Sequence, residues 1–127
     1  MPVSLKIDLS GKYNLFKNST NEFLVFDKPE FEADRVGYAG IVVYSGISFD
    51  DFGNSVYYAF DMACTYEISA DAKVYPVKGE IGKVKCIKCG SVYDLSSGFG
   101  LPLSGLSKEV LRKYKVTVNE NFLYVYR

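Results

Sequence analysis

Two cysteines of this chain, Cys86 and Cys89, are separated by two residues and lead directly into Gly90-Ser91. This spacing lets both sulfurs point at one metal ion, and a glycine lets the backbone turn tightly around it. The third and last cysteine, Cys64, lies upstream. We therefore expect two loops that face each other, one carrying a single cysteine and the other carrying two.

The segments around the cysteines resemble the two ligand loops of a Rieske iron–sulfur domain, Cys-x-His and Cys-x-x-His-Gly-Ser-x-Phe/Tyr-Asp. Cys64–Tyr66 falls on the first loop and Cys86–Asp94 on the second. Downstream, Gly98–Gly105 resembles the third, proline-containing loop of that family, and Leu111–Val116 resembles its return strand. The resemblance is specific over residues 60–116 and implies a ferredoxin-like fold.

The chain departs from the family pattern at both histidine ligand positions. Tyr66 and Cys89 occupy these positions, and the sequence contains no histidine. A standard Rieske cluster, which two cysteines and two histidines hold, is therefore excluded. The resemblance further implies that Ser91 and Tyr93 hydrogen-bond the sulfurs of any cluster that is bound. The sequence is thus similar to a Rieske-like ferredoxin domain with a degenerate cluster site.

Length and charge restrict the class of protein. A chain of 127 residues has room for one hydrophobic core, so we expect residues 1–127 to form a single Rieske-like domain. Within it, residues 62–108 are expected to form the subdomain that carries the cysteine loops. Basic and acidic residues are equal at 15 each, which argues against a nucleic-acid partner because such proteins need a basic face.

The sequence also gives little indication of where in the cell the protein is located. It has no long uninterrupted apolar run, so we expect no transmembrane segment. No targeting signal is visible, and the localisation stays unassigned. Three cysteines, an odd number, predict no disulfide framework, although Cys86 and Cys89 could form a local disulfide.

The spacing of apolar residues indicates strands along most of the chain. Residues 3–9 alternate between apolar and polar, which is typical of a half-buried strand. The most apolar run, Tyr38–Tyr44, is short and β-branched, which predicts a buried central strand rather than a helix. Further short strands are expected at 23–26, 56–61, 73–77, 82–85, 116–118 and 122–126, about nine or ten in all.

These strands and an aromatic content of 16% predict an all-β protein. We expect stacked antiparallel sheets, a Rieske-like sandwich or barrel, with the cysteine-loop subdomain inserted. Residues 95–107 are rich in Gly and Ser and predict a loop. Ser107–Tyr114 could form about two helical turns with Ser107 as N-cap, whereas the family resemblance leads this stretch into a strand. Asp50 and Asp51 predict a solvated hairpin loop, since no closing Glu completes a calcium site.

Three hypotheses for the cysteines stay open, and the first is an atypical [2Fe–2S] cluster. Cys64, Cys86 and Cys89 would be ligands, with Tyr66 as the candidate fourth ligand. The phenol of a tyrosine has an ordinary pKa of about 10 and must lose its proton to bind well. Such a protein would transfer single electrons to a redox partner.

The second hypothesis is a structural zinc site, and the third is a site without metal. Cys-x-x-Cys-Gly resembles the knuckle of zinc ribbons, and Asp61, Tyr66 or Glu67 could add an oxygen ligand to the three sulfurs. Without metal, the cysteines would be small buried residues or free thiols. We favour the metal-free site, because every retained feature of the family also has a structural explanation.

Catalysis is not expected. The chain has no histidine to act as a general base beside a cysteine nucleophile. The functional hypothesis is therefore a Rieske-fold, ferredoxin-like protein that serves as a non-redox binding or structural module for an unidentified protein partner. An electron-transfer protein with a cysteine-rich [2Fe–2S] cluster is the alternative, and a structural zinc site is a further one.

Overall fold

The computed structural model describes residues 3–11, 13–17, 19–29, 31–32, 34–49, 55–67 and 69–127, with residues 47–49 and 55 described by their backbone alone. Eleven strands and one turn of 3-10 helix, η1 (Asn14–Phe16), lie within these ranges. No helix among them is long and apolar enough to cross a membrane. The loop predicted around Asp50 and Asp51 lies outside the described residues.

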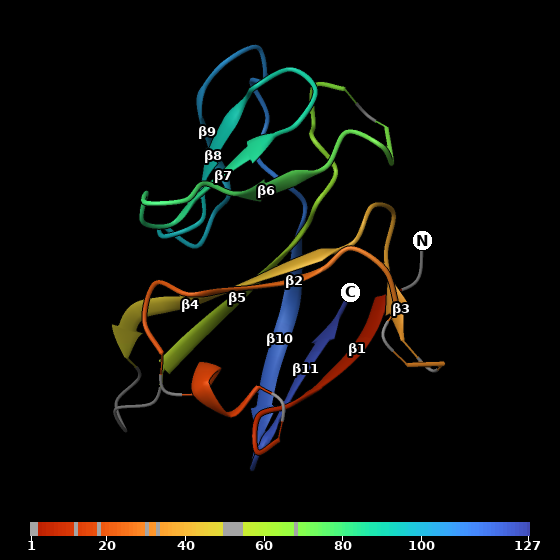
Figure 1. The fold of residues 1–127 in the computed structure, drawn as a ribbon, viewed down its shortest axis with the longest axis vertical. Coiled ribbons are helices and arrows are strands. Elements are labelled where there is room, and N and C mark those ends of the chain that lie inside the picture. The colour runs from red at the N-terminus through yellow and green to blue at the C-terminus, as the bar shows by residue number, and fades with distance from the viewer. Residues whose placement is uncertain are drawn as a thin grey trace.

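Seven antiparallel strands form the larger sheet, in the lower part of Figure 1. In spatial order they are β2 (Phe23–Phe26), β4 (Ile41–Phe49), β5 (Ser55–Asp61), β10 (Lys113–Asn119), β11 (Phe122–Tyr126), β1 (Val3–Asp8) and β3 (Arg35–Val36). The sheet curls so that β1 and β11 lie across from β2 and β4 (Figure 1). The larger sheet is thus a nearly closed barrel.

Four antiparallel strands form the smaller sheet, which lies above the barrel in Figure 1. They are, in order, β6 (Val74–Pro76), β7 (Lys83–Cys86), β8 (Val92–Asp94) and β9 (Leu101–Ser104). All four come from the part of the chain between β5 and β10. The predicted fold class, stacked antiparallel sheets with an inserted cysteine-bearing unit, is confirmed.

The first part of β4, residues 41–44, is buried on both faces, and this explains why these four residues are all apolar or aromatic. Ile41 and Val43 pack inside the barrel, in a core that we call the barrel core. Val42 and Tyr44 point the other way, into an intersheet core shared with the smaller sheet. Because successive residues of a strand face opposite sides, both faces of this strand need apolar side chains.

The intersheet core positions two of the three cysteines. Cys64 and Cys86 are fully packed members of this core, together with Tyr93 at its centre. Other members come from both sheets: Val42, Tyr44, Phe60, Met62, Val74, Val84, Leu95 and Leu111. Apolar packing therefore fixes the backbone from which these two sulfurs project.

The helix predicted at Ser107–Tyr114 is wrong. The chain is irregular from residue 107 to residue 112, and β10 begins at Lys113. The amide of Ser107 donates to Ser91 Oγ at 3.1 Å, and the amide of Leu111 donates to the carbonyl of Gly100 at 3.0 Å. The carbonyl of Gly100 therefore takes the amide of Leu111, which in a helix capped by Ser107 would donate to the carbonyl of Ser107.

Several strand boundaries differ from the predictions. The strand expected at Tyr38–Tyr44 begins only at Ile41 and continues to Phe49. Gly40 has φ +111°, and a Cβ there would lie 2.8 Å from the carbonyl oxygen of Phe26, so this position turns the chain into β4. The loop predicted over 95–107 contains β9, which lies at an edge of the smaller sheet, where a strand tolerates a proline.

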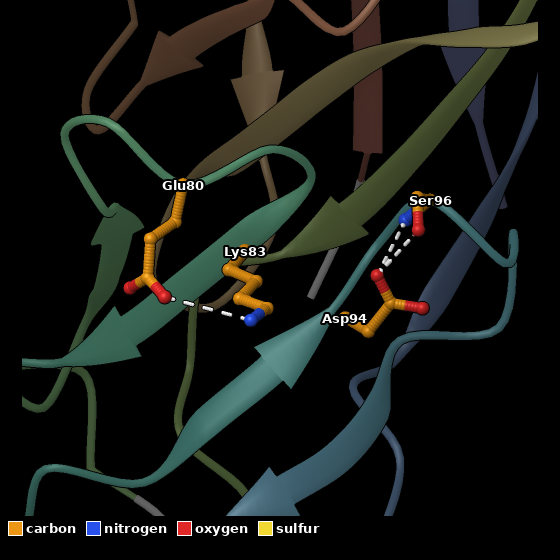
Figure 2. A network of polar contacts seen from close by, with 4 residues as sticks. All are labelled: Glu80, Lys83, Asp94 and Ser96. Carbon is orange, nitrogen blue, oxygen red and sulfur yellow. Dashed lines mark hydrogen bonds and ion pairs between the residues drawn. The ribbon is translucent and has the colours of Figure 1, made fainter.

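Local polar contacts close the turns of the smaller sheet. Figure 2 shows Lys83 within 3.5 Å of Glu80 in the turn before β7. It also shows Asp94, the last residue of β8, accepting hydrogen bonds from the amide and the hydroxyl of Ser96 at 3.1 and 2.6 Å. Asp94 thus organises the turn that follows β8, a common role for aspartate.

Candidate metal centre

The first cysteine loop, residues 63–67, leaves the end of β5. Ala63 pairs with Lys73 in an isolated β-bridge, and the amide of Cys64 donates to the carbonyl of Ala72 at 2.9 Å. These bonds attach the loop to the segment that enters β6. The Cys64 side chain is therefore held over the smaller sheet by backbone pairing as well as by its burial.

The second cysteine loop, residues 86–91, is the tight turn between β7 and β8. The amide of Cys86 donates to the carbonyl of Ser91 at 2.9 Å, and the amide of Gly90 donates back to the carbonyl of Cys86 at 3.1 Å. Gly90 has φ +77°, a left-handed conformation that glycine adopts without steric cost. The Cys-x-x-Cys-Gly pattern thus forms a closed turn.

The two loops bring all three sulfurs together. The Sγ atoms of Cys64, Cys86 and Cys89 lie within 4.8 Å of one another. Cys64 Sγ and Cys89 Sγ, which come from different loops, are 3.6 Å apart. The three cysteines are free thiols; Cys64 and Cys86 are buried, and Cys89 is partly exposed. The facing loops expected from the sequence are present, with their sulfurs directed at one point.

Backbone amides surround two of the sulfurs. The amides of Tyr66 and Glu67 donate to Cys64. The amides of Lys88 and Cys89 donate to Cys86, the first of them at 3.4 Å. Donors directed at a sulfur stabilise its negatively charged form, the form that binds metals.

Hydroxyl groups complete the surroundings of the sulfurs. The Tyr93 hydroxyl lies 3.3 Å from Cys64 Sγ, and Ser91 Oγ lies 3.1 Å from Cys89 Sγ. Ser91 Oγ also accepts the amide of Ser107, and its hydroxyl proton can be donated to Cys89 when that sulfur is a thiolate. Ser91 and Tyr93 therefore lie beside cysteine sulfurs, and that they hydrogen-bond a bound cluster stays a prediction.

A third loop, residues 104–110, contacts the first cysteine loop through Thr65 and the second through Ser91. Thr65 Oγ1 lies 2.6 Å from Ser107 Oγ and 3.0 Å from the Tyr93 hydroxyl, and it donates to the carbonyl of Glu109 at 2.9 Å. Sequence reasoning missed Thr65 and assigned Ser107 to a helix cap. The only available signal was a hydroxyl residue beside a cysteine, which is common in any loop.

The surroundings shift the proton affinities of these groups. Burial acts to raise the pKa of Cys64, but the hydrogen bonds from the Tyr93 hydroxyl and the two amides outweigh it, and this pKa lies below its usual value. Burial raises the pKa of the Cys86 thiol, with its two amide donors opposing. Burial, then the bond to Cys64, raises the pKa of Tyr93.

The predicted oxygen ligands have other surroundings. Tyr66 contributes its backbone amide to Cys64, while its side chain is 50% exposed. Asp61 is 2% exposed, and its carboxylate accepts hydrogen bonds from the Tyr114 hydroxyl and from the amides of Tyr38 and Ala63. The carboxylate of Asp61 therefore already has hydrogen-bond partners at the junction of β5 and β10.

Two open grooves reach the cysteines from outside. One, of about 510 Å³, is lined by the second cysteine loop and by β6, with Cys86 and Cys89 in its wall. The other, of about 270 Å³, includes Cys64, Thr65 and Arg112. Of the three cysteines, Cys89 alone is partly exposed, so solvent reaches the sulfur group on its side, whereas Cys64 and Cys86 are buried.

Comparison with known proteins shows the fold. No family model matches the chain, and no curated protein matches it. Among solved structures, it is similar to a chain from the "complex of reduced oxygenase and oxidized ferredoxin in carbazole 1,9a-dioxygenase", a Rieske-type ferredoxin. The TM-score is 0.55 at 20% identity, covering 98% of this chain and 93% of that one. The architecture is therefore that of a Rieske-type ferredoxin.

The cysteine group does not fit the two-iron cluster that this fold suggests. In a Rieske centre, the two cysteine positions bind one iron and the two histidine positions bind the other. Cys64 would thus lie on one iron and Cys89 on the other, with the width of the cluster between their sulfurs. Their actual separation of 3.6 Å leaves no room for two irons and their bridging sulfides.

Proposed function

We propose that this protein is a non-enzymatic Rieske-fold module that docks onto a partner protein through the end that carries the cysteines. The observation that carries the proposal is that each of the three loops at this end exposes a large apolar side chain. Tyr66 is 50% exposed in the first loop, Ile87 62% in the second and Leu106 56% in the third. We call these three side chains the apolar tip.

An exposed apolar group of this kind is typical of an interaction surface. The loops that carry it are held in place by backbone pairing and by the hydroxyl contacts of Thr65 and Ser91. Binding through fixed loops loses little conformational entropy, which favours affinity. The similar ferredoxin occurs in a complex with an oxygenase, which supports a protein as the kind of partner.

The proposal assigns no catalysis to this end of the molecule. Its hydroxyls are engaged with one another and with the sulfurs, and the chain has no histidine. The Asp61 carboxylate is already bonded to Tyr114 and to two amides. These groups therefore support a rigid binding surface better than proton transfer to a substrate.

The test begins with a photo-crosslinking residue at position 87 and, as a control, at position 118. Val118 is 49% exposed and lies toward the far end of β10 from the cysteine loops (Figure 1). We expect the probe at 87 to capture a partner that the probe at 118 does not capture. Equal capture from both positions would contradict docking through the apolar tip.

The captured partner is then purified, and its affinity is measured by calorimetry. The double variant Ile87→Glu/Leu106→Glu should weaken binding by about tenfold or more, since central apolar contacts carry most of the binding energy of an interface. Val118→Glu is the matched control and should leave the affinity unchanged. An unchanged affinity for the double variant would show that the partner binds elsewhere.

A second candidate is an electron carrier with an atypical [2Fe–2S] cluster. The hydroxyls of Ser91 and Tyr93 favour it, because they lie against sulfurs as the family pattern implies. It requires the two cysteine loops to move apart, so that Cys64 and Cys89 separate. Iron and acid-labile sulfide content of anaerobically purified protein decides the matter: equal amounts of both, with visible absorption, favour the carrier.

A further inference from the structure

We infer that Cys64, Cys86 and Cys89 together bind one thiophilic metal ion, of which Zn²⁺ is the representative, and leave its fourth coordination position to water. This inference goes beyond the docking function and is independent of it. It also differs from the metal-free site that the sequence favours, because the sequence could not show where the three sulfurs converge.

The spacing of the sulfurs matches a single ion. Zinc–sulfur bonds of about 2.3 Å in a tetrahedron place the sulfurs about 3.8 Å apart. Cys64 Sγ and Cys89 Sγ are 3.6 Å apart, and all three sulfurs lie within 4.8 Å of one another. Because no two of the sulfurs are more than 4.8 Å apart, small shifts of the side chains would complete the geometry, whereas a two-iron cluster requires the loops to separate.

The hydrogen bonds around the sulfurs also suit metal-bound thiolates. Each sulfur has at least one donor group beside it: amides and the Tyr93 hydroxyl at Cys64, amides at Cys86, and the Ser91 hydroxyl at Cys89. Three thiolates this close repel one another strongly unless a cation lies between them. A divalent ion supplies that charge, displacing the thiol protons without any change of oxidation state.

The ligand type selects the kind of metal. Three sulfurs with no imidazole favour Zn²⁺ and similar soft ions over Mg²⁺, Ca²⁺ and Mn²⁺, which prefer oxygen ligands. The carboxylate of Asp61 is engaged with Tyr114, so the described side chains place three ligands at the site. Cys89 is partly exposed and lines the groove beside the second cysteine loop, and from this side water can occupy the fourth position.

The experiment uses the full chain, reduced and freed of metal, titrated with Zn²⁺ against a chelator of known affinity. A parallel titration uses Co²⁺, whose absorption reports thiolate coordination and tetrahedral geometry. We expect one ion per chain, with the cobalt form showing both sulfur-to-metal charge-transfer bands and the ligand-field bands of a tetrahedral site. Binding of less than one ion per chain, or a spectrum without thiolate bands, would overturn the inference.

Variants test two of the three ligands. Removing outer hydrogen-bond partners of a metal site lowers affinity about 10–100-fold, so losing a ligand should lower it more. We therefore expect Cys89→Ser and Cys64→Ser each to weaken Zn²⁺ binding by more than about 100-fold. Cys89 is partly exposed, so this variant should keep its fold, which circular dichroism verifies. Wild-type affinity in folded Cys89→Ser would refute the three-sulfur site.

Tyr66→Phe and added imidazole test the fourth position. Tyr66→Phe should leave affinity and the cobalt spectrum unchanged, whereas a changed spectrum would make Tyr66 a ligand and overturn the open position. Imidazole should shift the cobalt spectrum by replacing water; an unaffected spectrum would show a closed site.

Ile87→Glu should keep the metal, so failure of docking and failure of metal binding are distinguishable.

Discussion

Tyr114 and Asp61 form a buried contact that links the barrel to the first cysteine loop. The Tyr114 hydroxyl, from β10, donates to the carboxylate of Asp61 at the end of β5. The same carboxylate accepts the amides of Tyr38 and Ala63 at 3.1 and 2.8 Å. Since Ala63 directly precedes Cys64, this carboxylate helps to set where the first cysteine loop begins.

Tyr114→Phe should lower the free energy of unfolding by about 1.5–3 kcal/mol, the usual loss for a hydrogen bond to a charged group. The cause is that a buried carboxylate loses one of its donors. Urea unfolding at neutral pH measures the change. Tyr126→Phe, at a tyrosine that is 39% exposed, is the control and should change stability by less than about 0.5 kcal/mol. Equal effects of the two variants would refute a special role for Tyr114.

Two glycines offer a matched pair for testing the contact between the second and third loops. Gly105 and Gly79 have similar left-handed conformations, with φ +92° and +83°. A Cβ at Gly105 would lie 2.6 Å from the Cα of Ser91, whereas a Cβ at Gly79 would meet no atom within 4 Å. Gly105 thus allows the third loop to lie against the residue whose hydroxyl contacts Cys89.

Gly79→Ala should cost about 1–2 kcal/mol, the strain of a left-handed alanine. Gly105→Ala should cost about 1–3 kcal/mol more, because it also forces two backbones apart. Chemical denaturation of both variants measures the difference. If the two substitutions destabilise the protein equally, the third loop is not packed tightly against Ser91.

At the scale of elements, the hairpin of β10 and β11 connects the cysteine-bearing end of the molecule to β1 and β3, the last strands of the larger sheet. Its register pairs Asn119 with Phe122, so Glu120 and Asn121 form a two-residue turn. Glu120 has φ +56°, an uncommon conformation for a residue with a side chain. The carbonyl of Asn121 accepts the amide of Leu9 at 2.7 Å, which attaches the end of β1 to this turn.

Glu120→Gly should raise the free energy of unfolding by about 0.5–1 kcal/mol. Glycine removes the strain of the left-handed conformation, which exceeds the entropy that glycine adds to the unfolded chain. Glu120→Ala retains the strain and is the control, with no gain expected. Thermal unfolding of the three proteins provides the comparison, and a less stable glycine variant would show that the turn is not strained.

At the scale of the whole molecule, buried phenols make stability depend on alkaline pH. Burial raises the pKa of Tyr44, Tyr93 and Tyr114, and the neighbouring carboxylate of Asp61 raises that of Tyr114 further. In the unfolded chain these phenols lose their protons near pH 10. Above that pH the folded state therefore binds more protons than the unfolded state.

The free energy of unfolding should consequently fall as the pH rises above about 10, with the phenol contribution intact below it. Urea midpoints measured from about pH 8 to about pH 11 test this expectation. Tyr114→Phe should show a shallower decline, since one of the titrating groups is gone. A midpoint that does not change across this range would contradict the assignment.

Much of the architecture could be predicted from local patterns. The alternation of residues 3–9 corresponds to β1, and the C-terminal apolar segments correspond to the β10–β11 hairpin. The helix at Ser107–Tyr114 could not be rejected, because its amides are taken by Ser91 and Gly100, residues distant in sequence. The short strand β9 was not predicted because its Pro and Ser residues are also typical of loops.

The sequence by itself determined the all-β class, the two cysteine loops and the absence of a histidine-ligated cluster, since residue type and spacing settle these locally. Only the tertiary structure decided that Cys64 lies 3.6 Å from Cys89, that Thr65 joins the first cysteine loop to the third loop, and that the end of the molecule with the cysteine loops exposes the apolar tip. These features depend on how the smaller sheet packs over the barrel, which brings together residues that no local pattern relates.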